Sequence, residues 1–165
     1  MEEIHSVYGE RETVEYDDLS KLVYLEQIIK ETLRIHSPLQ GTFRVSPTNR
    51  TVTIEGLTLP PKTEIFVSIQ VPQSSEKNWD SPAVFDPDRF GAGKQITPFT
   101  FFAFAAGPRV CIGKHFAMME MKVLLSKLFH DLKLCDARPG ESVLEKVTSL
   151  TVKPKHGVFV NVQCD

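Results

Sequence analysis

The segment that most constrains this chain runs from Phe104 to Gly113 and reads FAAGPRVCIG. Glycine and proline precede Cys111, and apolar residues at helical spacing follow it, so the loop delivers a cysteine to the start of a helix. There the positive end of the helix dipole and the free backbone N–H groups favour thiolate over thiol. Because thiolates are strong metal ligands, Cys111 is a candidate metal-binding residue.

The neighbours of Cys111 have chemical roles of their own. Gly107 and Gly113 lack a β-carbon, which lets a flat cofactor approach the backbone closely. Arg109 is a permanent cation that can pair with a carboxylate on such a cofactor. Two other interpretations remain: a buried structural cysteine, and a thiol enzyme that uses Cys111 as nucleophile with a base such as His115. No Cys or His cluster completes a zinc site around His115.

This segment resembles the haem-binding signature of the cytochrome P-450 superfamily, F-x-x-G-x-R-x-C-x-G, at every defined position. The resemblance implies that Cys111 is the thiolate ligand of the iron in heme b and that Phe104 packs near it. It also implies a monooxygenase, because electron donation from the thiolate favours O–O cleavage in dioxygen. The expected partners are a lipophilic small-molecule substrate and a reductase that passes on electrons from NADPH.

Two further motifs agree with the family in type and order. Glu31 and Arg34 are three residues apart on one predicted helix face, where they can pair, although such a pair is often a solvated one. The pair also matches the E-x-x-R motif of the family. The stretch FDPDRF resembles the F-x-P-x-R-F segment, whose arginine is Arg89 here. The resemblance implies a buried network of Glu31, Arg34 and Arg89 with a structural role.

Other site residues follow from position alone. The resemblance implies that Arg44 contacts a haem propionate; a solvated surface arginine is the alternative. Six residues correspond to segments that line the substrate pocket in the family: Leu39, Gln40, Gly41, Thr42, Ser149 and Leu150. The stretches 37–44, 88–93 and 111–123 are similar to the cholesterol 24-hydroxylase-like branch, which implies a sterol or another lipophilic substrate.

The pattern of apolar residues predicts an α+β fold, mainly α. We expect a helix within 17–35, strands at 51–54, 57–59 and 65–71 in one small antiparallel sheet, and a long loop from 72 to 100 with a helical turn. A long helix over 112–132 and a strand at 158–162 follow. With the resemblance, this predicts a carboxy-terminal part of the cytochrome P-450 fold, one partial domain over 1–165.

Composition excludes some functions. The 165 residues carry a net charge of −2 without a basic cluster, which argues against nucleic-acid binding. Three widely spaced cysteines fit a reducing compartment. The resemblance covers the carboxy-terminal third of family members, without their membrane anchor or central oxygen-activating helix. We therefore expect a fragment of a protein on the cytoplasmic face of the endoplasmic reticulum, attached to the membrane through its missing amino-terminal part. A non-catalytic haem-binding fragment is the alternative function.

Overall fold

The computed structural model describes residues 2–137, 145–148 and 151–164. The helical segments are α1 (Glu2–Tyr8), η1 (Tyr16–Ser20), α2 (Val23–Ile35), α3 (Gln70–Ser74), η2 (Pro87–Phe90), η3 (Gly107–Arg109) and α4 (Lys114–Asp131), where η marks a 3-10 helix. The strands are β1 (Gly41–Val45), β2 (Val52–Ile54), β3 (Leu57–Leu59), β4 (Glu64–Ser68), β5 (Leu132–Asp136), β6 (Lys146–Thr148), β7 (Val152–Pro154) and β8 (Val160–Cys164). Helices and antiparallel strands occupy separate stretches, so the predicted α+β architecture is confirmed.

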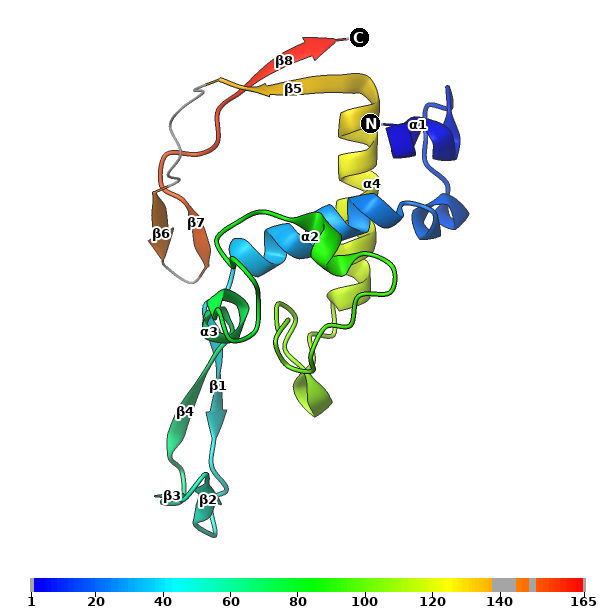
Figure 1. Cartoon of the computed structure of the whole chain (residues 1–165). Coiled ribbons are helices and arrows are strands. Elements are labelled where there is room, and N and C mark those ends of the chain that lie inside the picture. The colour runs from blue at the N-terminus through cyan, green and yellow to red at the C-terminus, as the bar shows by residue number, and fades with distance from the viewer. Residues whose placement is uncertain (1, 138–144, 149–150, 165) are drawn as a thin grey trace.

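The core lies where the three longest helices meet. Figure 1 shows α2 crossing α4, with α1 beside the far end of α4. The buried apolar side chains of this cluster are Ile4, Tyr8, Leu19, Leu22, Leu25 and Ile29, and methionines of α4 pack against them. The hydroxyl of Tyr8 donates a hydrogen bond of 2.9 Å to the carbonyl oxygen of Ser126. The first and last helices are therefore joined through one core.

The start of α2 is capped by a residue from another helix. Leu22 precedes α2 and has no side-chain oxygen, so it cannot satisfy the free N–H groups of the first turn. The carboxylate of Glu3 on α1 accepts hydrogen bonds from the backbone nitrogens of Tyr24 at 2.6 Å and Leu25 at 2.9 Å. Its negative charge also faces the positive end of the helix dipole.

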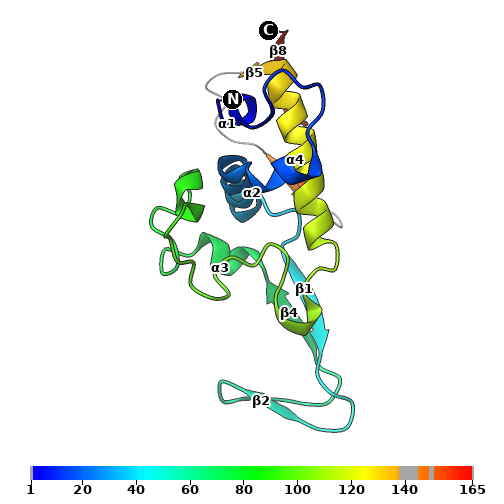
Figure 2. The same ribbon diagram turned by 90° about the vertical axis from the view of Figure 1, so that its right-hand side faces the viewer.

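The strands form four separate two-stranded antiparallel ribbons. Strand β1 pairs with β4, with Gly41 opposite Ser68, and β2 pairs with β3 in a hairpin that closes at Glu55 and Gly56. Figures 1 and 2 show the β1–β4 ribbon extending away from the helices, with the β2–β3 hairpin at its tip. Strand β5 continues from α4 and pairs with β8, and β6 pairs with β7.

Several boundaries differ from the predictions. The expected helix over 17–35 is interrupted at Lys21 and Leu22, so α2 begins only at Val23 after a separate 3-10 turn. The expected strand over 65–71 ends at Ser68, whose hydroxyl accepts a hydrogen bond from Val71 N and starts a helical turn. The expected single sheet is wrong, because β4 pairs with β1, which the sequence pattern did not reveal.

Candidate functional site

The cysteine loop is closed by backbone hydrogen bonds. The amide nitrogen of Cys111 donates to the carbonyl oxygen of Phe104 at 2.9 Å, and Val110 N donates to Gly107 O at 3.0 Å. Gly107 has a φ of +71°, a conformation that disfavours side chains with a β-carbon. The carbonyl of Cys111 accepts from Lys114 N at 3.3 Å, which leads directly into α4. The structure therefore places the thiol at the amino-terminal end of α4, as predicted.

The thiol of Cys111 is free and exposed. Around it stand exposed apolar side chains: Ile112 is fully accessible, at 103% relative exposure, and Phe116 is 64% exposed. Arg109 is exposed, and among the described residues its guanidinium forms no ion pair. These features suit an apolar macrocycle that carries carboxylates: the thiol can bind its metal, the apolar side chains can contact its ring, and Arg109 can pair with a carboxylate.

The donor set also fits haem. Within residues 2–137, 145–148 and 151–164, no group of three or more His, Cys, Asp or Glu side chains is arranged to hold a metal ion. Any metal at Cys111 would need most of its ligands from elsewhere, and a porphyrin supplies four nitrogens to an iron that takes one thiolate from the protein. Cys111, Arg109 and Gly113 are thus the residues that would hold such a group.

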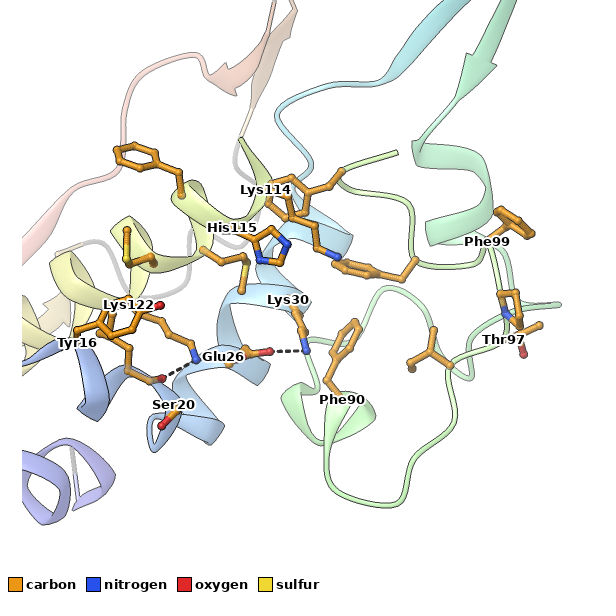
Figure 3. Close-up of a pocket in the computed structure, with 18 residues that line it drawn as sticks. Tyr16, Ser20, Glu26, Lys30, Phe90, Thr97, Phe99, Lys114, His115 and Lys122 are labelled. Atoms are coloured by element: carbon orange, nitrogen blue, oxygen red, sulfur yellow. Dashed lines mark hydrogen bonds and ion pairs between the residues drawn. The ribbon is translucent and has the colours of Figure 1, made fainter. Parts of the chain in front are cut away.

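Phe104 lines a cavity beside the cysteine loop. This half-open cavity of about 940 Å³ lies between η1, α2, the loop before Cys111 and the first turns of α4. Figure 3 shows this cavity with Lys30, Lys114 and His115 around it. The side chain of Phe104 thus faces the cavity, and its carbonyl oxygen accepts from Cys111 N. A position next to the thiolate was the role expected for it.

A buried lysine, Lys122, also lines this cavity. Lys122 Nζ donates to the carbonyl of Leu19 at 2.8 Å and to Glu26 at 2.6 Å, and Glu26 also pairs with Lys30 at 2.6 Å. Burial raises the pKa of Glu26, but hydrogen bonds from Lys122 and Lys30 outweigh it and hold the pKa below its usual value. Sequence reasoning missed this cluster, because Lys122 reads as one of several polar positions on the exposed face of α4.

The structure brings Glu31, Arg34 and Arg89 together. Arg34 binds the Glu31 carboxylate with two hydrogen bonds, of 2.7 and 2.8 Å, and both side chains are buried, at 1% and 0% exposure. The Nε atom of Arg89 lies 3.4 Å from Glu31 Oε1. Trp79 stacks under the Arg34 guanidinium, with 5.1 Å between Cζ and the ring centroid. The pair is therefore not the solvated one that its spacing alone would favour.

This network fastens the loop after α3 onto α2. Arg34 donates to the carbonyl oxygens of Gln73 and Pro82, at 2.7 and 2.8 Å, and Glu31 accepts from the backbone nitrogen of Asp86 at 3.0 Å. Burial raises the pKa of Glu31, but Arg34, the Asp86 N–H and Arg89 together lower it by more, so the pKa lies below its usual value. The carboxyl group is therefore ionised at neutral pH. Among the described residues, no hydrogen bond or ion pair links the network to another site residue that the sequence singled out. This arrangement agrees with the structural role expected for it.

The remaining predicted positions lie on other elements. Arg44 on β1 donates to Thr42 Oγ1 at 3.0 Å and to the carbonyl of Phe43 at 2.8 Å, so its guanidinium is turned back on its own strand. Gln40 donates to Thr148 Oγ1 at 3.3 Å, and Val152 N donates to Pro38 O at 2.8 Å. These bonds place the segment 38–40 beside Thr148 at the end of β6 and Val152 at the start of β7. Ser149 and Leu150 lie outside the described residues.

The nucleophile interpretation finds no support in the geometry. In the described part of the chain no hydrogen bond links Cys111 with His115, whose side chain faces the cavity in Figure 3. A thiol nucleophile needs a base within hydrogen-bond reach. Cys111 is also exposed rather than buried, so the structural-cysteine interpretation does not describe it either.

The sequence matches a known family over most of its length. The family model described as Cytochrome P450 matches residues 1–160. The chain belongs to the cytochrome P450 family. Cytochrome P450 4B1 of Rattus norvegicus is 35% identical over 164 residues, covering 96% of this chain and 31% of the relative. Cytokinin hydroxylase of Arabidopsis thaliana is 34% identical over 160 residues, covering 96% of this chain and 30% of the relative.

Two more comparisons extend this result. Beta-amyrin 6-beta-monooxygenase of Solanum lycopersicum is 33% identical over 162 residues, which cover 98% of this P450 chain and 33% of the relative. A retinoic acid-bound cyanobacterial CYP120A1 shares the fold with a TM-score of 0.86 and 27% identity, over 99% of this chain and 37% of that structure. The expected P450 fold is thus confirmed, and the chain spans about a third of the length of these relatives. The narrower cholesterol 24-hydroxylase-like branch is not supported by them.

Membrane attachment was expected only through an amino-terminal part outside this chain. Of the helices in the described residues, none has both the length and the apolar character needed to cross a bilayer.

Proposed function

We propose that this P450 chain forms the thiolate-bearing half of a haem-thiolate monooxygenase site, which inserts one oxygen atom from dioxygen into a lipophilic substrate. The observation that carries the proposal is the free, exposed Cys111 thiol at the start of α4, in a loop closed onto Phe104. Family membership supports heme b as the group that Cys111 binds. When bound, haem supplies the oxygen chemistry, and thiolate donation favours O–O cleavage.

The chain's own residues bind and orient this group. Cys111 contributes the thiolate, and the amino terminus of α4 helps to keep it deprotonated. Arg109, exposed beside it, binds a propionate carboxylate with a charge-assisted hydrogen bond. Arg44 is a second propionate partner once its side chain leaves Thr42 and Phe43. Gly113 leaves room for a flat ring at the start of the helix, and Phe104 shields the thiolate from the cavity side.

The proposed substrate class is lipophilic. The names of two relatives refer to cytokinin and beta-amyrin, and the similar solved structure is bound to retinoic acid. Such diverse names support the broad class and do not favour sterols over other lipophilic molecules. Leu39, Gln40, Gly41 and Thr42, beside Thr148, are the residues of this chain that we assign to the pocket wall. A sterol substrate remains the narrower hypothesis within that class.

The proposed electron source is NADPH through a reductase, and the proposed location is the endoplasmic reticulum membrane. Both proposals are supported by membership of the cytochrome P450 family and by the likeness to cytochrome P450 4B1 of Rattus norvegicus and cytochrome P450 4A10 of Mus musculus. Membrane attachment is assigned to the part of the relatives' length that this chain does not span.

The test is to supply the haem-loaded protein with a reductase, NADPH and a panel of lipophilic compounds that includes a sterol, under isotopically heavy dioxygen. We expect products that carry one heavy oxygen atom. The same test is made with a protein that contains this chain and has the full length of the relatives. If that protein binds haem but gives no labelled product, the non-catalytic haem-binding alternative is favoured. A labelled product from the sterol alone would establish the narrower hypothesis.

A further inference from the structure

Gln73 occupies a junction between the Glu31–Arg34 helix and the cysteine loop. It lies in α3 and its side chain is fully buried. Its backbone oxygen accepts the 2.7 Å hydrogen bond from Arg34 Nη1. Sequence analysis assigned this stretch to a loop and gave Gln73 no role.

One end of the Gln73 amide holds the carboxyl end of α2. The Nε2 atom donates to the carbonyl oxygen of Arg34 at 3.2 Å and, more weakly, to that of Leu33 at 3.4 Å. Both carbonyls belong to the last turn of α2, where no intrahelical N–H is available to them. In a buried location an unpaired carbonyl is costly, so this contact fixes the amide against α2.

The other end of the amide holds the cysteine loop. Gln73 Oε1 accepts a hydrogen bond of 2.8 Å from the backbone nitrogen of Phe102. The carbonyl of Phe102 accepts from Ala105 N at 2.9 Å, and the carbonyl of Phe104, the residue before Ala105, accepts from Cys111 N at 2.9 Å. A continuous series of short contacts therefore leads from α2 through one side chain to the thiol-bearing residue.

The loop needs such an anchor. Between Phe99 and Lys114 the only regular element is the short η3, and two non-glycine residues, Phe99 and Ala105, have positive φ values of 65° and 57°. Backbone in this region is strained and persists only where surrounding contacts determine it. Gln73 supplies a contact of this kind from α3, whose Gln73 carbonyl is held by Arg34 of the buried ion pair.

We propose that Gln73 is a positioning residue: its side-chain amide sets the location of the cysteine loop relative to α2 and thereby holds the Cys111 thiolate at the haem iron. The role depends on both functions of the amide, a donor toward α2 and an acceptor toward Phe102. It rests on the proposed haem-thiolate function. A metal site tolerates little displacement of a ligand, and such supporting contacts keep it in place.

The experiment compares Gln73→Met, Gln73→His and Gln27→Met in the haem-loaded protein. Methionine keeps the side-chain length but removes both hydrogen bonds. A neutral imidazole keeps one donor and one acceptor. Gln27 is a matched control, because it is a buried glutamine on α2 whose side chain makes no hydrogen bond among the described residues. The readout is the fraction of carbon monoxide-bound, reduced haem with the red-shifted band of thiolate ligation, normalised to total haem.

We expect Gln73→Met to lower the ratio of thiolate-ligated haem to all other haem about five-fold, the change in ratio that one hydrogen bond of ordinary net strength corresponds to. Gln73→His and Gln27→Met should stay near the wild-type fraction. An unchanged fraction in Gln73→Met, or an equal loss in Gln73→His, would overturn the positioning role. If Gln73→Met takes up no haem, Gln73→His decides. Haem uptake with the red-shifted band in Gln73→His supports the proposal, because that side chain keeps one donor and one acceptor, and no red-shifted band in Gln73→His contradicts it.

The wild-type spectrum separates this inference from the proposed function. A wild-type protein that binds haem without the red-shifted band contradicts the haem-thiolate function, and the role of Gln73 is then wrong as well. A wild-type protein that shows the band, with Gln73→Met showing it equally, contradicts the role of Gln73 alone.

Discussion

The backbone nitrogen of Cys111 donates a 2.9 Å hydrogen bond to the carbonyl oxygen of Phe104. This contact joins the candidate iron ligand to the aromatic residue expected to shield it, so the two cannot move independently. Cys111 carries the exposed thiol, and Phe104 lines the cavity. Whatever fixes the backbone near Phe104 therefore also fixes the thiol.

The buried ion pair predicts a large effect of Arg34→Met on stability. The substitution leaves the carboxylate of Glu31 buried, with only Arg89 at 3.4 Å as a cationic partner. Stranding one member of a buried pair costs roughly 3–5 kcal/mol of unfolding free energy. Urea denaturation measures this loss.

The control for Arg34→Met lies on the same helix. Lys30→Met removes a partner of Glu26, but that pair is about one-third exposed on both sides and Glu26 keeps Lys122. Partly exposed pairs contribute about 1 kcal/mol or less. Equal losses in the two variants would show that Glu31 and Arg34 are not a buried pair.

Asp18 predicts a specific acid sensitivity. The hydrogen bond from Lys21 lowers its pKa most, Arg11 and the Glu15 N–H lower it further against the effect of burial, and the pKa falls from 3.8 to about 2. Because the folded pKa is depressed, the stabilisation is fully present above pH 3.8 and is lost as the pH falls toward 2.

The measurement for Asp18 is the denaturation midpoint as a function of pH, with Asp18→Asn as the comparison. The stability difference between wild type and Asp18→Asn should be constant above pH 3.8 and should shrink between that value and about 2. Parallel curves across the whole range would contradict the assignment of the lowered pKa to Asp18.

The cap that α1 supplies to α2 can be tested with two adjacent glutamates. Glu3→Ala removes both hydrogen bonds to Tyr24 and Leu25, and loss of a cap costs about 1 kcal/mol. Glu2→Ala removes the same charge one position earlier, without those contacts. Helix content by circular dichroism and unfolding free energy should fall in Glu3→Ala only; equal behaviour of the two variants would mean that the carboxylate does not cap α2.

The sequence was most informative where local chemistry determines structure. The helix after Cys111 was predicted over 112–132 and is observed as Lys114–Asp131, since Gly113 precedes it and no proline or glycine interrupts it. The strands around Glu55 and Gly56 were also predicted nearly to the residue, because the turn is short and local. Cys111 was placed at the helix start for the same reason.

Contacts between distant segments were beyond the sequence pattern. Strand β1 was missed because its pairing with β4 depends on a partner some twenty residues away. The break before α2 follows from Asp18, whose bonds to Arg11 and Lys21 close a separate turn. The side chains of Gln73 and Lys122 bind backbone groups of distant segments. An isolated polar residue in a loop or on a helix gives no periodic signal from which such contacts could be predicted. Helix α1 has only seven residues, too few for a distinct period.

The most direct test of thiolate ligation compares Cys111→Ala with Cys135→Ala, since both positions hold free, exposed cysteines. Each protein is loaded with haem, reduced and exposed to carbon monoxide, and the difference spectrum is recorded. We predict that wild type and Cys135→Ala give the red-shifted band of a thiolate-ligated haem and that Cys111→Ala does not. A red-shifted band that survives in Cys111→Ala, or that disappears only in Cys135→Ala, would contradict the assignment of Cys111 as the iron ligand.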